Sequence, residues 1–405
     1  MSKEPTRSVN GHPLAVIAAL FFATLALRPQ LVGIGPLLPA IQADLGVSFA
    51  VVGLLGTIPV LLMGLFAPLG PWVAGRIGPR QAIALCLVGV IVFGIARAAA
   101  PGMPLILLTT IGIGLGMGTA GALLPIVVKL RAEDGPARAT GAYAAGIVTG
   151  ALVAAAVAVP LAMDLGSWRW PLLAFALAGI VSLVAWLLLL PGDDPSLRGT
   201  GRPPRLPWRD PTARLLAGIF AAQSMLYYAS ISWLPAVYVE RGWSESEAGN
   251  LVAVMHLVGL AAGILIPFVA DRVGSRRGQL VTVAAITCVG LAGFIVWPDA
   301  AMAWAAIIGI GLGAIFPLCL TLPVDVADRA SGVGAVAAFM LLGGYVTSSL
   351  GPVGLGLIRD ATGDFAIGLW MVLGLGIALL VACSLLTPAR LRRGVGRTIA
   401  VPSEA

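Results

Sequence analysis

PWVAGRIGPR at residues 71–80 returns as PFVADRVGSR at residues 267–276, 196 residues further along the chain. The same offset relates Leu38-Pro39-Ala40 to Leu234-Pro235-Ala236. A single match would arise by chance in so apolar a composition. A constant offset that runs through two apolar segments and the loops after them indicates an internal repeat. The sequence therefore predicts two similarly folded halves.

The composition places both halves in a lipid bilayer. The chain of 405 residues is 59% hydrophobic and 11% charged, whereas soluble domains carry about 25% charged residues. A membrane-spanning helix needs roughly 20 mostly apolar residues. The long continuous runs do not fit the short alternating strands of a β-barrel. The sequence predicts an all-α membrane protein, with twelve transmembrane helices in two pseudo-symmetric six-helix bundles, over Leu14–Ala40, Phe49–Ala74, Gln81–Ala100, Pro104–Leu130, Ala139–Met163, Trp168–Leu190, Ala213–Val239, Glu247–Ala270, Leu280–Trp297, Ala300–Val324, Gly332–Leu357 and Phe365–Leu386.

One long polar stretch interrupts the apolar segments, and it reads PGDDPSLRGTGRPPRLPWRDPT at residues 191–212. Its proline, glycine and arginine content is typical of a linker. We expect an N-terminal six-helix bundle at residues 1–190, a cytoplasmic linker at 191–212, and a C-terminal bundle with a cytoplasmic tail at 213–405. A simple connection is at least as good an interpretation of the linker as a regulatory segment.

The net charge of +7 would suit a nucleic-acid-binding protein, but its distribution indicates membrane topology. If the N-terminus is inside, 20 of the 25 lysines and arginines fall in inner segments. Positive charge gathers on the cytoplasmic side of membrane proteins. We therefore predict a multi-pass protein of the bacterial inner membrane with both termini in the cytoplasm. Besides Arg28, the arginines outside the inner segments are expected in outer loops, at Arg97, Arg169, Arg241 and Arg359.

Arg28 lies near the middle of the first apolar segment, about 14 residues or roughly 21 Å from its start. A fixed charge at that depth is costly and usually functional. None of the 18 acidic residues falls in the central part of an apolar segment. A guanidinium offers a planar fork of donors to carboxylate, cyanate or nitrate oxygens. We therefore predict a secondary transporter of a small anion, although Arg28 could instead cap carbonyls where Pro29 breaks the helix.

His256 is the second ionisable residue at depth, about ten residues or roughly 15 Å into its segment. Histidine can exchange a proton near neutral pH, which makes proton–anion symport one route. A protonated substrate and exchange without protons are the other two. The structural alternative is a neutral histidine that is hydrogen-bonded within the bundle.

Polar side chains on other segments complete the predicted site. Gln223 and Tyr227 share one helical face, and Tyr228 follows them. Ser224 is the repeat equivalent of Arg28, so we expect an asymmetric site. For such residues helix packing and local hydrogen bonds are the alternative roles. The weaker candidates for substrate contact are Gln30, Tyr143, Tyr345 and Ser348.

Several classes of function find no support in the sequence. It has no Walker lysine motif and no catalytic triad, and its four cysteines lack metal-ligand spacing. We therefore expect neither an enzyme nor a cofactor or metal. The expected partners are a small, anionic solute and the lipid bilayer, with no nucleic acid, and the expected state is a monomer.

The repeated stretches at residues 71–80 and 267–276 resemble the Gly-x-x-x-Asp-Arg-x-Gly-Arg-Arg signature of the major facilitator superfamily. The resemblance covers essentially the whole chain and implies that family's fold. It also implies roles in conformational gating for the residues that match the signature. The first copy has Gly75 where the family has the acid that helps to latch the outward-open state. The implied gating residues are Arg76, Arg80, Asp271, Arg272 and Arg276.

A narrower resemblance comes from LRPQLVGIGPLL at residues 27–38, which is similar to a stretch of the cyanate and 2-nitroimidazole permease branch. That similarity implies small substrates that are often planar or anionic. Efflux of small planar neutral heteroaromatics, such as 2-nitroimidazoles, is the alternative function. The fifth segment lacks the glycine-rich stretch ending in Gly-Pro that marks drug/proton antiporters.

Overall fold

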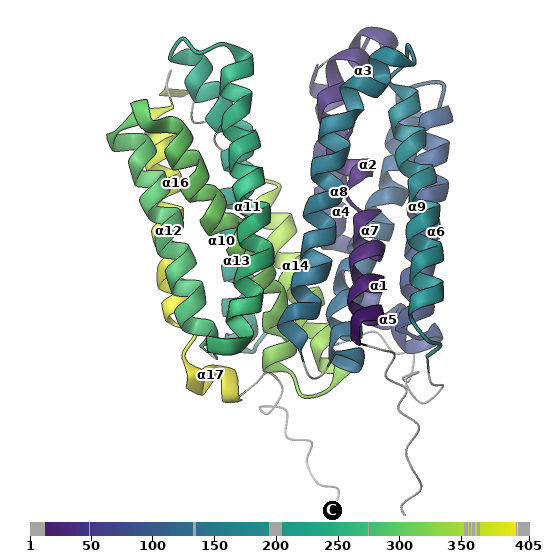
Figure 1. Ribbon diagram of the computed structural model, residues 1–405, viewed down its shortest axis with the longest axis vertical. Helices are drawn as coiled ribbons and strands as arrows, with labels where there is room; N and C mark the ends of the chain where they lie inside the picture. The colour runs from purple at the N-terminus through teal and green to yellow at the C-terminus, as the bar shows by residue number, and fades with distance from the viewer. Residues whose placement is uncertain are drawn as a thin grey trace, which may run out of the picture.

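In a computed structural model of the chain, two bundles of helices stand side by side (Figure 1). The structure describes residues 13–393 and 395, except for residues 48, 133–134, 194–204, 274 and several positions between 352 and 364. Helices α1–α9 form one bundle and helices α10–α17 form the other. The described part of the chain contains helices and no strand, which confirms the predicted all-α fold. Most of the predicted linker lies outside the described residues.

The described part of the first bundle contains ten helical elements, several of which are pieces of one broken span. They are α1 (Pro13–Leu25), α2 (Pro29–Val32), η1 (Gly35–Leu37), α3 (Leu38–Leu45), α4 (Phe49–Phe66), α5 (Leu69–Ile77), α6 (Pro79–Ala99), α7 (Met103–Arg131), α8 (Pro136–Asp164) and α9 (Arg169–Leu189).

The described part of the second bundle contains eight helical elements. They are α10 (Pro211–Glu240), α11 (Glu245–Val273), α12 (Arg276–Val296), η3 (Pro298–Ala300), α13 (Ala301–Val326), α14 (Ala330–Ser348), α16 (Ala366–Ser384) and α17 (Pro388–Arg393).

Local chemistry sets where helices begin. Asp210 precedes α10, and its carboxylate accepts hydrogen bonds from the backbone N–H of Thr212 at 2.8 Å and of Ala213 at 2.9 Å. Such a cap satisfies N–H groups that have no partner inside the helix. Gly78 has a φ of 89° and turns the chain into α6, which starts at Pro79. This turn closes the first of the two repeated stretches.

Within the described residues, ten helices are long and apolar enough to cross a membrane, and the number reaches twelve if each of two bent pairs is one span. One bent pair is α4 with α5, at an angle of 57°. Each predicted segment overlaps one of these spans or bent pairs, although the segment predicted at Gly332–Leu357 extends past the span Ala330–Ser348. The outer surface is apolar, with Leu188 and Val296 each 79% exposed. Lipid is the solvent that suits such a surface, because water would have to hydrate it at a large cost in free energy.

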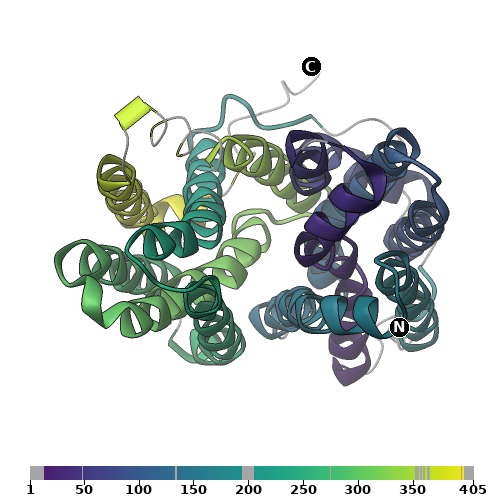
Figure 2. The same cartoon turned by 90° about the horizontal axis from the view of Figure 1, so that it is seen from above.

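The bundles meet near one end of the molecule and diverge toward the other (Figure 1), and seen from above they lie side by side (Figure 2). We call the end that carries α17 and the start of α1 the lower end, and the end that carries α3 the upper end. Helix α8 packs on α11, and α14 packs on α4 and α7, so these contacts join the two bundles. At Gly64 of α4 an added Cβ would lie 3.0 Å from the Val346 side chain of α14. The backbone of α4 at Gly64 therefore lies directly against the Val346 side chain of the other bundle.

Candidate functional site

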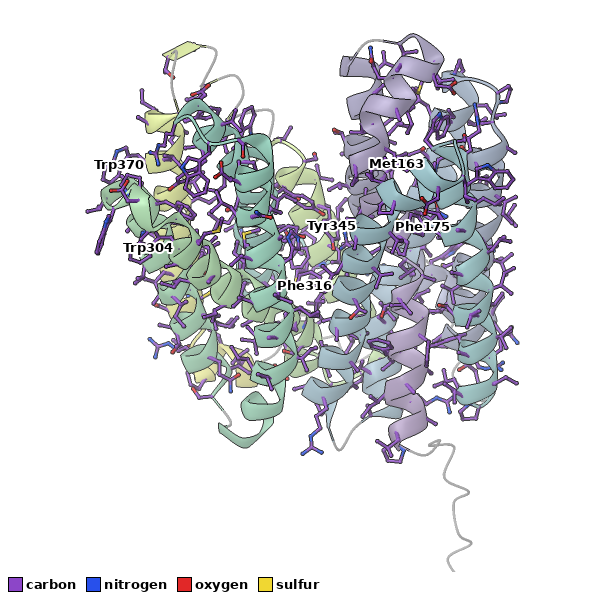
Figure 3. All side chains as sticks on the ribbon, turned by 45° about the horizontal axis from the view of Figure 1, so that its top comes forward. Met163, Phe175, Trp304, Phe316, Tyr345 and Trp370 are labelled. Atoms are coloured by element: carbon purple, nitrogen blue, oxygen red, sulfur yellow. The ribbon has the colours of Figure 1, made fainter. Side chains whose placement is uncertain are left out.

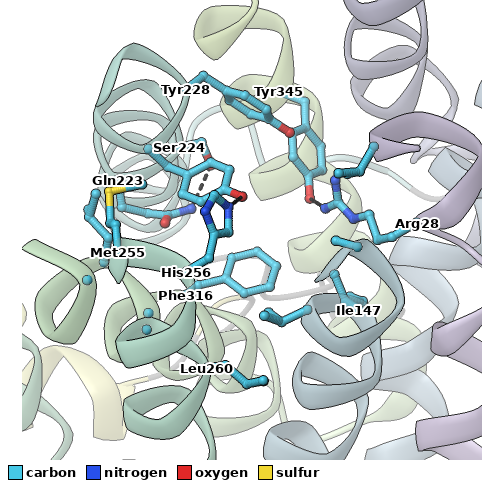
Figure 4. Close-up of a pocket in the computed structure, with 18 residues that line it drawn as sticks. Arg28, Ile147, Gln223, Ser224, Tyr228, Met255, His256, Leu260, Phe316 and Tyr345 are labelled. Carbon is cyan, nitrogen blue, oxygen red and sulfur yellow. Dashed lines mark hydrogen bonds between the residues drawn. The ribbon is translucent and has the colours of Figure 1, made fainter. Parts of the chain in front are cut away.

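The break in the first span positions Arg28. Helix α1 ends at Leu25 and α2 begins at Pro29, whose ring removes the N–H that would continue the helical hydrogen bonds. The Arg28 carbonyl accepts from the backbone N–H of Leu31 and Val32, each at 3.0 Å, and so starts α2. Arg28 is 9% exposed. The break thus places a buried guanidinium beside the second bundle (Figure 4).

Arg28 reaches across the interface between the bundles. Its Nη2 donates to the hydroxyl of Tyr345 on α14 at 3.3 Å. No carboxylate pairs with it among the residues that the structure describes.

The second bundle supplies the wall that faces Arg28. Helix α10 contributes Gln223, Ser224, Tyr227 and Tyr228 to it, and α11 contributes His256 (Figure 4). The Gln223 amide donates to the Ser224 hydroxyl at 2.6 Å. Two of these polar side chains are therefore hydrogen-bonded to each other.

His256 is held at both ring nitrogens. Nδ1 lies 2.8 Å from the Val252 carbonyl, and Nε2 lies 2.8 Å from the Tyr227 hydroxyl. A carbonyl only accepts, so the hydrogen-bond pattern assigns a proton to Nδ1 and leaves Nε2 as the acceptor from Tyr227. If the ring takes up a second proton, at Nε2, that hydrogen bond reverses, because Nε2 then donates to the tyrosine oxygen. The ring can therefore take up a proton on the nitrogen that faces Tyr227 while its other bond stays in place.

These residues surround a cavity between the bundles with about 780 Å³ of atom-free space, including the part that opens to solvent. A smaller cavity lies below it, toward the lower end. Four residues line both cavities, namely Arg28, Ile147, Phe316 and Tyr345. They form the floor of the upper cavity, and Figure 3 shows Phe316 and Tyr345 in the space between the bundles.

The predicted substrate contacts divide into those that line a cavity and those that do not. Arg28, Gln223, Tyr227, Tyr228, Tyr345 and His256 line the upper cavity. Tyr143 lines the lower cavity, and its hydroxyl lies 3.5 Å from the Leu320 carbonyl of the other bundle.

Gln30 and Ser348 are not among the residues that line either cavity. The Gln30 amide donates to the Leu172 carbonyl at 3.2 Å, inside the first bundle. The Ser348 hydroxyl donates to the Tyr345 carbonyl of its own helix at 3.1 Å. Both were weaker candidates for substrate contact, and the rotation of their helices turns both side chains into protein packing.

Arg97 departs from the sequence expectation most clearly. It was expected in an outer loop, but it lies in the last turn of α6 and its side chain is fully buried. Its Nη2 donates to the backbone carbonyl of Gln30 at 2.6 Å and also to the Gln30 side-chain oxygen. The apolar run ends near Arg97 in the sequence, so hydropathy could not distinguish a buried position from a loop.

The described gating candidates form contacts at the lower end. Arg80 donates from Nε to the Leu190 carbonyl at 2.7 Å and from Nη2 to the Leu187 carbonyl at 2.5 Å, so it caps the end of α9. Arg76 lies over the Trp72 ring at 4.3 Å. Arg76 thus makes a cation–π contact near the end of α5.

The two halves also hold ion pairs at the lower end. Arg276 donates from Nε to Asp325 at 2.9 Å in the second bundle. In the first bundle Asp193 accepts from the backbone N–H of Arg80 at 2.8 Å and pairs with Arg131 at 3.2 Å. Asp193 was not predicted, because its partners come together only in the fold. The predicted gating side chains of Asp271 and Arg272 lie outside the described residues.

Apolar residues of the cavity also escaped the sequence analysis. Phe316 and Met255 line the upper cavity. Nothing in the sequence distinguishes them from other apolar residues of membrane helices, because only the packing of α11 and α13 brings them to the interface.

The model of the Major Facilitator Superfamily matches residues 14–352 and 216–401. The cyanate transport protein CynX of Escherichia coli K12 is 32% identical over 351 residues, which cover 86% of this chain and 91% of that protein. The 2-nitroimidazole transporter of the same strain is 32% identical over 376 residues, which cover 92% and 94% of the two chains.

Solved structures agree at the level of the fold. The human organic anion transporter MFSD10 superposes with a TM-score of 0.77 at 14% identity, over 92% of this chain and 99% of that one. The transporter FucP, in the outward conformation, gives a TM-score of 0.74 at 13% identity, over 93% and 98% of the two chains. The protein is therefore a multi-pass membrane transporter for a small-molecule substrate and not an enzyme. By sequence and by fold, the chain belongs to the Major Facilitator Superfamily.

Proposed function

We propose that the protein is a secondary active transporter that moves a small anion of the cyanate, nitrate or small-carboxylate type, and that Arg28 binds its negative group. One observation carries the proposal. The guanidinium of Arg28 is 9% exposed between the bundles, and within the described residues it contacts a hydroxyl and pairs with no carboxylate. A buried cation without a counter-charge stabilises an anion that reaches it.

We further propose that the lower end faces the cytoplasm of a bacterial inner membrane, with both termini inside. Arg76, Arg80, Arg131 and Arg276 all lie near the lower ends of their helices, as positive charge does on the cytoplasmic side. The divergence of the bundles at the upper end then corresponds to an outward-facing state. Rocking of one bundle against the other would close the upper cavity and open the lower one. We expect the transporter to work as a monomer.

His256 is our candidate for the proton carrier. Protonation at Nε2 would give the cavity a second positive charge beside Arg28, so a proton and an anion would favour each other's binding. Proton–anion symport follows from that linkage. Two other routes need no histidine, namely a substrate that carries its own proton and exchange of one anion for another.

Transport of a small planar neutral heteroaromatic is the second candidate function. The aromatic rings of Tyr227, Tyr228 and Phe316 around the cavity favour it, as does the 32% identity with the 2-nitroimidazole transporter. In that case Arg28 would donate a hydrogen bond to a nitro or carbonyl oxygen.

The test is uptake into proteoliposomes by wild-type protein and by Arg28→Gln. Loss of the charge should reduce uptake of the best anion among cyanate, nitrate and formate by at least tenfold, as expected for the loss of a buried charge-assisted hydrogen bond. Arg241→Gln is the matched control, since Arg241 is an exposed arginine, and it should transport normally. Normal anion uptake by Arg28→Gln would contradict the proposal. Flux of a neutral nitroimidazole that does not respond to membrane voltage would favour the second candidate.

A further inference from the structure

The upper cavity has a polar part and a larger apolar part. Eleven of its eighteen lining residues are apolar or glycine. Gln223 is hydrogen-bonded to Ser224, and His256 is hydrogen-bonded to Tyr227 and to Val252. These four side chains therefore have fewer free donors for a ligand. The strongest remaining donor to an anion is the Arg28 guanidinium.

This arrangement disfavours a bare inorganic anion. Cyanate or nitrate is hydrated on every side in water, and on entering the cavity it exchanges these hydrogen bonds for those that the lining residues offer. A polar group that is buried without hydrogen bonds costs free energy. Arg28 can serve one side of the anion only. Apart from Arg28, the tyrosine hydroxyls and the polar groups of α10 and α11, the cavity is lined by residues such as Ile147, Phe316, Leu260 and Met255 (Figure 4), which can offer no hydrogen bond in place of water.

A ligand with one charged end and an apolar body matches both parts of the cavity. Its charge would lie at Arg28, and its body would displace water from the apolar wall, which is favourable. The rings of Phe316, Tyr227 and Tyr228 add flat surfaces, and aromatic rings pack on one another in stacked or edge-to-face arrangements. A flat body therefore fits this wall better than a globular one.

We infer that the substrate is a monocarboxylate with a flat apolar body, such as an aromatic carboxylate. This inference rests on the proposed anion transport and narrows it. The carboxylate would take the fork of Arg28, and the ring would lie against Phe316 and the tyrosines of α10. No bond is made or broken in this binding.

Binding of five probes to the purified full chain tests the inference. Benzoate is the reference, and benzamide has its shape without its charge. Cyclohexanecarboxylate has its charge without its flatness, and formate and cyanate have a charge without the body. We expect benzoate to bind at least tenfold more tightly than benzamide, formate or cyanate, and severalfold more tightly than cyclohexanecarboxylate.

A variant of the wall separates the possible outcomes. Phe316→Leu should weaken benzoate about fivefold and leave formate unchanged, while Phe93→Leu, on the exposed surface of the first bundle, should change neither. Cyanate binding as tightly as benzoate would overturn the aromatic carboxylate and leave anion transport intact. Equal binding of benzamide and benzoate, unaffected by Arg28→Gln, would overturn anion transport itself.

A second inference concerns Arg97 and rests on different observations. Arg97 and α9 hold the short helix α2 from two sides, through Gln30. Arg97 donates to the carbonyl and the side-chain oxygen of Gln30, and the Gln30 amide donates to Leu172. The packing around α2 is tight. A Cβ added at Gly94 would lie 2.7 Å from the Gln30 amide nitrogen, and one added at Gly33 would meet the Phe175 ring.

The contact lies where the first span is interrupted. Helix α2 has only four residues and is followed by the 3-10 turn η1. Carbonyls at the end of so short a helix lack helical partners, and Arg97 supplies a donor to one of them. Its Nε and Nη1 have no hydrogen-bond partner in the described structure. Burying a cation whose donors are partly unused costs free energy. This cost indicates that Arg97 has a role through its contact with Gln30.

We infer that Arg97 is a positioning residue for Arg28. Only Pro29, whose φ is fixed, separates Arg28 from Gln30. Clamping Gln30 therefore fixes the direction in which the Arg28 side chain leaves the break. This inference depends on the proposed role of Arg28 in binding.

A double-mutant cycle distinguishes positioning from general stability. The variants are Arg97→Gln, Arg28→Gln and their combination, and the readouts are the Kd of the tightest-binding anion and the thermal midpoint. Arg97→Gln should raise the Kd about tenfold in the wild-type background and have no further effect in Arg28→Gln. Residues that act through each other show such non-additivity. Arg97→Lys, which keeps a charge and a donor, should recover part of the affinity and serves if Arg97→Gln does not fold.

Two results would overturn the positioning role. One is an unchanged Kd in Arg97→Lys or Arg97→Gln with a lower thermal midpoint, which describes a purely structural residue. The other is an equal effect of Arg97→Gln in both backgrounds. If Arg28→Gln alone leaves anion binding unchanged, the failure lies in the proposed function instead.

Discussion

Residues 28 and 224 are equivalent in the internal repeat, and one is arginine while the other is serine. Arg28 reaches out of a broken span toward the other bundle, whereas Ser224 lies in the long helix α10 and accepts from Gln223. At the lower end the equivalents Arg80 and Arg276 are the same residue and both anchor their own bundle. The repeat thus preserves the scaffold near the membrane surface and differs where the bundles face the cavity.

Moving the cation to the other bundle is the strongest test of this asymmetry. Arg28→Ser should weaken anion binding about 100-fold, since it removes a charge and its hydrogen bonds from a buried site. Adding Ser224→Arg to that variant should not restore binding, because no helix break aims residue 224 across the cavity. Isothermal titration calorimetry would measure both. Recovery to within threefold of the wild type would mean that the two sides are interchangeable.

The proton site offers the next largest contrast, because His256 has no ionisable counterpart in the first bundle (residue 60 is Val60). His256→Gln should reduce accumulation of the anion driven by a pH gradient by about tenfold, while exchange of labelled for unlabelled anion continues. The measurement is uptake into vesicles with and without the gradient. Tyr227→Phe, which removes only the hydroxyl bonded to Nε2, should give an intermediate loss. Unchanged accumulation by His256→Gln would point to one of the two routes without histidine.

The hydrogen bond between the bundles should have a smaller effect. Tyr345→Phe removes the hydroxyl that Arg28 contacts, and one such bond contributes about 1 kcal/mol. The lower cavity should open about fivefold more often, read as faster thiol labelling of Gly121→Cys from the lower side. Gly121 lines that cavity. The control is Tyr238→Phe, whose hydroxyl bonds to Pro298 within one bundle at 2.9 Å. Equal labelling rates in both variants would show that the contact does not hold the bundles together.

The smallest expected difference is in the contribution of the two lower-end ion pairs to thermal stability. The side chains of Arg131 and Asp193 are 2% and 7% exposed, against 15% and 20% for Arg276 and Asp325. Breaking the more buried pair leaves a less hydrated charge behind. Asp193→Asn should therefore lower the thermal midpoint by about 2–4 °C more than Asp325→Asn does, measured by the fluorescence of the purified protein on heating. The reverse order would mean that the second bundle depends more on its pair.

Hydropathy and the repeat sufficed to predict the spans, because a bilayer imposes a length and an apolar surface on each helix. They also singled out Arg28, since a charge in the middle of an apolar run stands out. Arg97 gave no such signal at the end of its run, and its burial depends on the contact with Gln30. Phe316 could not be predicted as a cavity residue, because in the sequence it resembles every other apolar residue of the spans. Which face of a helix meets the cavity depends on packing between segments far apart in sequence.

The floor residues Arg28, Ile147, Phe316 and Tyr345 belong to the walls of both cavities. A solute that travels from one side to the other would therefore keep the same anchor while the protein moves around it. Compounds too bulky to pass would compete for that anchor from whichever side they are added. The side on which such a blocker is more potent would report which state of the transporter predominates at rest.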